Sequence, residues 1–234
     1  MSAFLAVTYD DRVELLTDGA IYTADGTLTG IRRKVWPVGN LPIAITGRGN
    51  SGVLDAFVAV FRVAAGACAT VDDALASMAG VIERRAGKGM PSDVEMVICA
   101  ISESRGPSLF YFATADMWGA GIEPWTLVEV DSPFYGGPLV DVSDLSARDG
   151  LAEVGAEVFS RMRRTPGRNP LNPEMPKLYG IGGHVDHTTV SAAGCTIERI
   201  HEWPEDVVGR RIDGLGADKS FGSRFGARVV KSRR

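Results

Sequence analysis

The order of strands and helices along the chain predicts an α+β fold built from antiparallel sheets. Two short strands, at 3–9 and 12–17, are joined by a tight polar turn and form a hairpin. Two consecutive helices follow at about 50–66 and 70–87. They do not fit a repeating strand–helix–strand unit, and they favour helices laid over an antiparallel sheet. A second hairpin, over about 184–202, ends the predicted fold.

The segment between the first hairpin and the first helix is predicted to be a connection and two strands. Residues 19–33 contain Gly and Thr and read as a connection that leads to Lys34. Strands follow at about 34–38 and 42–46. Pro37 cannot donate to a sheet ladder, so the first of them is predicted at a sheet edge or in an irregular segment.

The boundaries of the two helices are indicated by capping residues. The first helix is predicted to begin near Asn50 or Ser51, which are both good N-caps, and to end near Gly66. The second begins at Thr70 and ends at Gly87. Each helix has apolar residues at helical spacing, which predicts one buried face per helix.

The second half of the chain predicts three more strands and one long helix. The strands are expected at about 94–102, 108–114 and 125–130, and the helix at about 143–163. The strand at 94–102 is apolar on nearly every position, so it is predicted to be central and covered on both faces.

Composition excludes several classes of protein. The chain has 234 residues, 45% hydrophobic and 23% charged, with a net charge of −4, so we expect a globular fold that does not bind nucleic acid. No apolar stretch is long enough to predict a membrane span. The three cysteines, Cys68, Cys99 and Cys195, form no CxxC pair and predict neither a disulfide framework nor a zinc site. A reducing, cytoplasmic location is expected, and no cofactor is predicted.

The run His184-Val185-Asp186-His187 contains three side chains that can bind a metal ion. On a strand, His184 and Asp186 share a face while His187 points away. Only two ligands would converge, which is too few for a protein metal site, so no metal is predicted.

The candidate catalytic residues near the start of the chain are Ser2, Asp18 and Lys34. If Met1 is removed, Ser2 carries a hydroxyl and a free α-amine on one Cα, so the nucleophile has its own base attached. Asp18 and Lys34 both follow predicted strands. Simpler explanations stay open: Asp18 can belong to a turn, and Asp18 with Lys34 can be a buried ion pair without catalysis.

This opening stretch resembles the start of the proteasome β-subunits, and more closely that of the bacterial proteasome-like peptidase HslV. The family's nucleophile, acid and lysine fall on Ser2, Asp18 and Lys34 with no gap. The resemblance therefore implies that Lys34 lies beside the α-amine and disfavours its protonated form, and that Asp18 holds Lys34 in place. The family's oxyanion-hole glycine falls on Gly47 after one inserted residue, although Gly47 and Gly49 can also serve only to allow a positive φ before the helix.

The resemblance implies the fold of the N-terminal nucleophile (Ntn) hydrolases, a four-layer αββα sandwich of two antiparallel sheets. Residues 1–212 would form this domain. Residues 213–234 would be a basic tail, either flexible and solvated or an arm that docks on a neighbouring subunit or an anionic surface.

Two later segments depart from the family pattern. Leu178 and Ile181 occupy the positions of an Asp and a Ser ahead of a Gly-Gly pair, and neither can accept a proton. The family's Gly-Ser-Gly segment is altered to the stretch 132–137, where Ser132 is a candidate for the missing hydroxyl.

These observations give two hypotheses for function. The first is a proteasome-like hydrolase that cleaves peptide or other amide bonds with Ser2 as nucleophile. The alternative is a catalytically inactive relative that serves as a structural subunit of a larger assembly, including one derived from a phage or virus. Both imply a homo-oligomer, for which the family suggests a ring, while no partner ATPase is identified.

Overall fold

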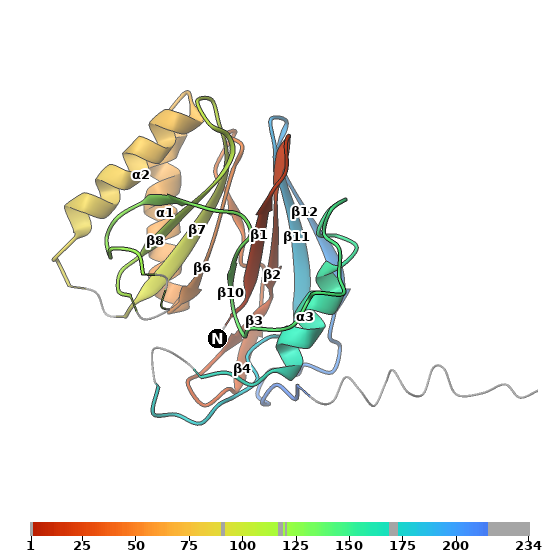
Figure 1. Cartoon of the computed structure of the whole chain (residues 1–234). Coiled ribbons are helices and arrows are strands. Elements are labelled where there is room, and N and C mark those ends of the chain that lie inside the picture. The colour runs from red at the N-terminus through yellow and green to blue at the C-terminus, as the bar shows by residue number, and fades with distance from the viewer. Residues whose placement is uncertain (1, 90–91, 117–118, 120, 169–172, 215–234) are drawn as a thin grey trace, which may run out of the picture.

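The computed structural model describes residues 2–89, 92–116, 119, 121–168 and 173–214. Within these ranges the chain forms three helices, two five-stranded antiparallel sheets and a separate two-stranded hairpin (Figure 1). The expected α+β class with antiparallel pairing is therefore confirmed. The basic tail predicted from residue 213 lies, beyond Gly214, outside the described residues.

The strands are numbered in chain order, and each sheet combines distant parts of the chain. The first sheet has the order β10 (Phe134–Gly136), β1 (Phe4–Thr8), β2 (Arg12–Asp18), β11 (His184–Ser191) and β12 (Gly194–Glu202). The second has the order β5 (Trp36–Pro37), β6 (Ile43–Gly49), β7 (Val94–Ser102), β8 (Gly106–Ala113) and β9 (Val128–Val130). The small hairpin pairs β3 (Ala20–Tyr22) with β4 (Leu28–Ile31). The helices are α1 (Ser51–Gly66), α2 (Val71–Arg85) and α3 (Gly155–Arg164).

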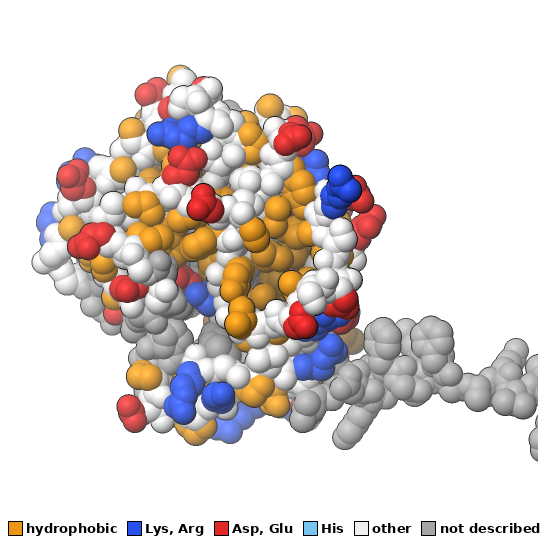
Figure 2. Space-filling view, in the orientation of Figure 1, with side chains coloured by type: hydrophobic (Ala, Val, Ile, Leu, Met, Phe, Trp, Pro, Cys, Tyr) orange, Lys and Arg blue, Asp and Glu red, His pale blue; other side chains and the backbone are white. Residues whose placement is uncertain are grey.

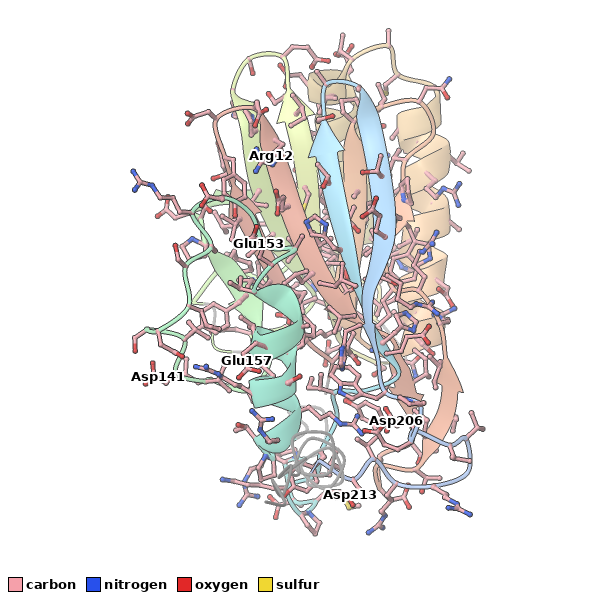
Figure 3. The ribbon with its side chains drawn as sticks, turned by 90° about the vertical axis from the view of Figure 1, so that its right-hand side faces the viewer. Arg12, Asp141, Glu153, Glu157, Asp206 and Asp213 are labelled. Carbon is pink, nitrogen blue, oxygen red and sulfur yellow. The ribbon has the colours of Figure 1, made fainter. Side chains whose placement is uncertain are left out.

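Three apolar cores separate the layers. Phe4 and Leu15 of the first sheet and Val97 and Tyr111 of the second share one core, so the two sheets pack against each other. α1 and α2 cover the outer face of the second sheet. α3 lies across the outer face of the first sheet, where Figure 3 labels its Glu157. The order helices, sheet, sheet, helix is compatible with the expected sandwich.

The strand registers bring the start of β1 and the end of β6 to the same end of the molecule. Phe4 lies opposite Thr17 in β2 and Gly136 in β10. The guanidinium of Arg48, near the end of β6, lies 5.3 Å from the centre of the Phe4 ring. Arg12, the first residue of β2, lies at the far end of the sheet, as Figure 3 shows.

The segment 19–33, predicted as a connection, contains the hairpin β3–β4, and that prediction was wrong. Its turn lies between Thr23 and Thr27: the N–H of Gly26 donates to the carbonyl oxygen of Thr23 at 2.9 Å, and Gly26 has φ 86°. One carboxylate oxygen of Asp25 accepts a hydrogen bond from the backbone N–H of Thr27. Asp-Gly between two short apolar runs is a hairpin signal, and the sequence reading overlooked it.

The helix predicted over 143–163 begins only at Gly155, so its first part was wrong. Glu14 of β2 accepts a hydrogen bond from the backbone N–H of Leu151 at 2.6 Å, and Gly150 has φ 142°, which is not helical. A buried carboxylate from β2 therefore binds backbone that a helix would otherwise pair within itself. Burial acts to raise the pKa of Glu14, but its hydrogen bonds outweigh that effect and lower the pKa.

The other predicted elements agree with the structure to within a few residues. Asn50 is the N-cap of α1 and accepts hydrogen bonds from the N–H groups of Gly52 and Val53. α2 ends at Arg85, two positions before the predicted Gly87. β9 is shorter than predicted, and β10 was not predicted at all.

The surface carries some large exposed hydrophobic side chains. In Figure 2 such side chains gather on the near face, in the region where Figure 1 places β10. Tyr135 of β10 is 47% exposed, and Leu139 just after it is 76% exposed. In the described ranges no helix combines the length and the apolar character that crossing a membrane requires.

Candidate active site

Lys34 contacts both Ser2 and Asp18, as the resemblance implied. The ammonium nitrogen Nζ of Lys34 donates to Ser2 Oγ at 2.9 Å. It also donates to both carboxylate oxygens of Asp18 at 3.0 Å. The side chain of Asp18 is 0% exposed and that of Lys34 is 6% exposed, while Ser2 is partly exposed. The hydroxyl is thus the member of the group that solvent and a substrate can reach.

The Asp18 carboxylate is fixed by the backbone on either side of it. Oδ1 accepts a hydrogen bond from the N–H of Ala3 at 2.9 Å, and Oδ2 accepts one from the N–H of Ala20 at 3.1 Å. Together with Lys34, these donors compensate a charge that is completely removed from water. Asp18 therefore ties the start of β1 to the start of β3 and holds Lys34 in place.

Lys34 is anchored through its backbone as well as its side chain. Its carbonyl oxygen accepts a hydrogen bond from the hydroxyl of Thr46 at 2.9 Å. Burial is the largest influence on the Lys34 ammonium and lowers its pKa from the ordinary value of 10.5. The charge and hydrogen bonds of Asp18 act against this, and Arg32 adds a further lowering effect. The net direction is downward, which increases the fraction of neutral amine near Ser2 Oγ.

Gly47 lies on β6 next to Thr46, whose hydroxyl binds the carbonyl oxygen of Lys34. β6 is therefore the strand that contacts the backbone of Lys34. A Cβ at this position would lie 2.4 Å from the carbonyl oxygen of Glu95 and 2.8 Å from Leu54 Cδ2. Glycine is therefore required here by the close packing of α1 and β7 on β6. A positive φ is found at Gly49, at 126°, so that alternative explanation applies to Gly49 rather than to Gly47.

His184 and Asp186 are neighbours of the candidate site that the sequence reading did not assign to it. His184 Nε2 lies 3.1 Å from Asp186 Oδ2, and both side chains are buried. The sequence signal was their shared face on one strand. That pattern indicates at most a two-ligand metal site, and no group of three or more His, Cys, Asp and Glu side chains that could hold a metal ion occurs in the described residues.

Of the two positions that depart from the family pattern, Leu178 lies against the turn of the β3–β4 hairpin, where a Cβ on Gly26 would be 3.5 Å from Leu178 Cβ. Ile181 is fully buried in the same core as Ala3, and Gly137 lies against Ala3, since a Cβ on Gly137 would be 3.1 Å from Ala3 Cβ. Neither position offers a proton acceptor on its side chain.

Ser132 does not supply the missing hydroxyl, so that suggestion was wrong. Its Oγ accepts a hydrogen bond from the N–H of Thr8, the last residue of β1. Six residues of extended chain separate Thr8 from Ser2, which corresponds to about 20 Å. Ser132 therefore lies at the opposite end of the sheet from the candidate site.

No protein-family model matches the chain, and no curated protein matches it significantly. The chemistry of the site therefore rests on the geometry of its own residues. A partly exposed hydroxyl in contact with a buried amine of lowered pKa, which is itself held by a carboxylate, is an arrangement that can activate the hydroxyl for nucleophilic attack.

Proposed function

We propose that the chain is a hydrolase of the proteasome-like Ntn type that cleaves amide bonds with Ser2 as its nucleophile. The observation that carries the proposal is the contact of Ser2 Oγ with Lys34 Nζ at 2.9 Å, with Asp18 holding the other side of the ammonium. The layer order of the fold supports the same family, because it is compatible with the αββα sandwich that the resemblance implies.

The proposed reaction forms and then hydrolyses an ester on Ser2. Oγ attacks the carbonyl carbon of the amide while a neutral amine takes the hydroxyl proton. The amine returns that proton to the leaving nitrogen as the C–N bond breaks, which leaves an acyl-enzyme ester. Water then attacks the ester, and its proton passes through the same amine back to Oγ. In this mechanism the N–H of Gly47 stabilises the oxyanion.

Two amines are suited to take the proton. One is Lys34 Nζ, which already contacts Oγ and whose pKa is lowered. The other is the α-amine of Ser2, whose ordinary pKa is about 8 and which exists only after removal of Met1. The resemblance favours the α-amine, and the hydrogen bond favours Lys34.

A second candidate function is that of a structural subunit of this fold without catalysis. It is favoured by Leu178 and Ile181, neither of which can accept a proton, at positions where the family pattern has an Asp and a Ser. Ile181 is fully buried in the same core as Ala3. In that case the Asp18–Lys34 pair serves to hold the start of β1 to its neighbours.

Covalent labelling tests the proposal. A β-lactone probe acylates a reactive hydroxyl alone, whereas an epoxyketone probe also needs the free α-amine. We expect a β-lactone adduct on the full-length chain that is absent from Ser2→Ala. Intact mass of the labelled protein then reports whether Met1 is present. A folded chain that forms no adduct with either probe would overturn the enzyme proposal and favour the structural subunit.

Assembly and location also remain proposals. We infer a homo-oligomer, of which a ring is the form that the resemblance suggests. Cys68, Cys99 and Cys195 are free thiols, which suits a reducing, cytoplasmic location. Native mass spectrometry tests the oligomer directly.

A further inference from the structure

His184 packs directly on the backbone that carries Asp18. A Cβ on Gly19 would lie 2.4 Å from Cε1 of the His184 ring, so the ring occupies the space next to Gly19. The N–H of Gly19 also lies 3.0 Å from the carbonyl oxygen of His184. His184 is 1% exposed, so its ring has no freedom to turn away into solvent.

Asp186 fixes the orientation of that ring. Its Oδ2 is 3.1 Å from His184 Nε2, and the Asp186 side chain is buried. Burial acts to raise the pKa of Asp186, but the hydrogen bond and charge of His184, together with Arg199, outweigh it and lower the pKa. Because Asp186 is therefore ionised near neutral pH, Nε2 must carry the proton of this hydrogen bond.

The same carboxylate reaches the other side of the candidate site. Arg33 Nε lies 3.8 Å from Asp186 Oδ2, and Arg33 immediately precedes Lys34 in the chain. The His184–Asp186 pair thus contacts the neighbours of both members of the buried ion pair, Gly19 beside Asp18 and Arg33 beside Lys34.

We propose that His184, oriented by Asp186, is a positioning residue that holds the Asp18–Lys34 pair in register with Ser2. The proposal rests on the proposed function for its catalytic consequence. Its action is indirect: the ring blocks movement of the Asp18–Gly19 backbone, and Lys34 Nζ keeps its short contact with Ser2 Oγ only while Asp18 stays in place. Small displacements of such groups lower reaction rates by large factors.

The chain contains a matched control on the same strand. His187 is also a buried histidine of β11 that contacts a carboxylate, with Nε2 2.9 Å from Glu14 Oε2. Its partner Glu14 binds the loop at Leu151 and not the candidate site. A substitution at His187 therefore reproduces the loss of a buried histidine–carboxylate contact without touching Asp18 or Lys34.

The test compares His184→Leu, His184→Gln and His187→Leu in the full-length chain. Leucine fills space above Gly19 but loses the hydrogen bond, whereas the glutamine amide can still donate to Asp186. With the β-lactone probe we expect His184→Leu to lower the maximal inactivation rate about 10- to 100-fold with little change in the half-saturating concentration. His184→Gln should stay close to the wild type, and His187→Leu should not lower the rate. Asp186→Asn weakens the same contact and replaces His184→Leu if that variant does not fold.

A second readout separates this proposal from the proposed function. The N–H groups of Ala3 and Ala20 bind Asp18, so their hydrogen-exchange rates report whether Asp18 is held in place without any need for activity. Faster exchange of these two amides in His184→Leu than in His187→Leu supports the positioning role even if the wild type is never labelled. The positioning role is overturned if the two amides exchange equally fast in His184→Leu and His187→Leu. It is also overturned if the probe labels the wild type and His184→Leu is inactivated at the same rate as the wild type.

Discussion

Replacement of Lys34 by methionine tests whether the charges at the candidate site are held as the structure indicates. The substitution removes the ammonium and keeps a flexible chain of similar length. Asp18 would then remain 0% exposed, with only the N–H groups of Ala3 and Ala20 to compensate its charge. The perturbation therefore creates an incompletely compensated buried carboxylate.

The expected loss of stability follows from the burial of both partners. Breaking a buried ion pair by removing one partner costs about 3–5 kcal/mol. For a domain of this length, 1 kcal/mol corresponds to about 2–4 °C in the midpoint of thermal unfolding. Lys34→Met should therefore lower the midpoint by about 6–20 °C. The double variant Asp18→Asn with Lys34→Met removes both charges, and it should be more stable than Lys34→Met alone.

Thermal unfolding followed by circular dichroism measures these differences. The control is Arg105→Met, which breaks a half-exposed pair with Glu129, where the two side chains are 48% and 50% exposed. Solvent screens that pair, so its loss should change the midpoint far less. The reasoning is refuted if Lys34→Met and Arg105→Met lower the midpoint equally, or if the double variant is no more stable than Lys34→Met.

Substitutions at three other positions test the packing at Gly47, the hydrogen bonds of Glu14 and the helix cap at Asn50. Gly47→Ala should destabilise the fold by about 1–3 kcal/mol in urea unfolding, because its Cβ would lie 2.4 Å from the Glu95 carbonyl oxygen, and no change in stability would contradict that packing. Although burial acts to raise it, hydrogen bonds hold the pKa of Glu14 below its ordinary value of 4.5. As the pH falls below about 4.5, the unfolded chain therefore binds the proton at Glu14 more readily than the folded chain does, and the folded state loses stability in acid. Glu14→Gln removes this effect, so its midpoint of thermal unfolding should fall less between pH 7 and 3 than that of the wild type. Asn50→Ala removes the N-cap of α1 and should cost about 1 kcal/mol in the same urea assay, whereas Asn50→Asp should cost little.

The elements that local pattern predicts well are those whose stability comes from their own sequence. Asn50 and Thr70 cap the two helices as predicted, since a capping side chain binds backbone only two or three residues away. β10 and the start of α3 depend on distant residues instead. β10 has three residues and is defined by its pairing with β1, and α3 begins late because Glu14, 137 positions away, binds Leu151. Periodicity within a short window contains no information about such contacts.

The same distinction applies to the residues of the candidate site: some could be predicted from the sequence, and others depend on contacts between distant segments. The resemblance to the proteasome-like family was enough to predict that Ser2, Asp18 and Lys34 meet, because the three residues match the family's pattern without a gap. The contribution of His184 could not be predicted, since its contact with Gly19 depends on the pairing of β2 with β11, which begins where Asp18 lies opposite Val185.

The fold can account for the buried Asp18–Lys34 ion pair, but not for the partly exposed hydroxyl of Ser2. Asp18 connects Ala3, Ala20 and Lys34, so a fold of this kind needs the carboxylate and the ammonium whether or not it catalyses a reaction. Ser2 is different. The Lys34 ammonium has three N–H donors, of which two bind the carboxylate of Asp18 and the third binds Ser2 Oγ. Water can accept the third hydrogen bond in place of the hydroxyl, and the Asp18–Lys34 ion pair is then kept. A stable fold therefore does not require a hydroxyl at this partly exposed position, whereas amide hydrolysis does. The reactivity of Ser2 is consequently the property that separates the enzyme from the structural subunit.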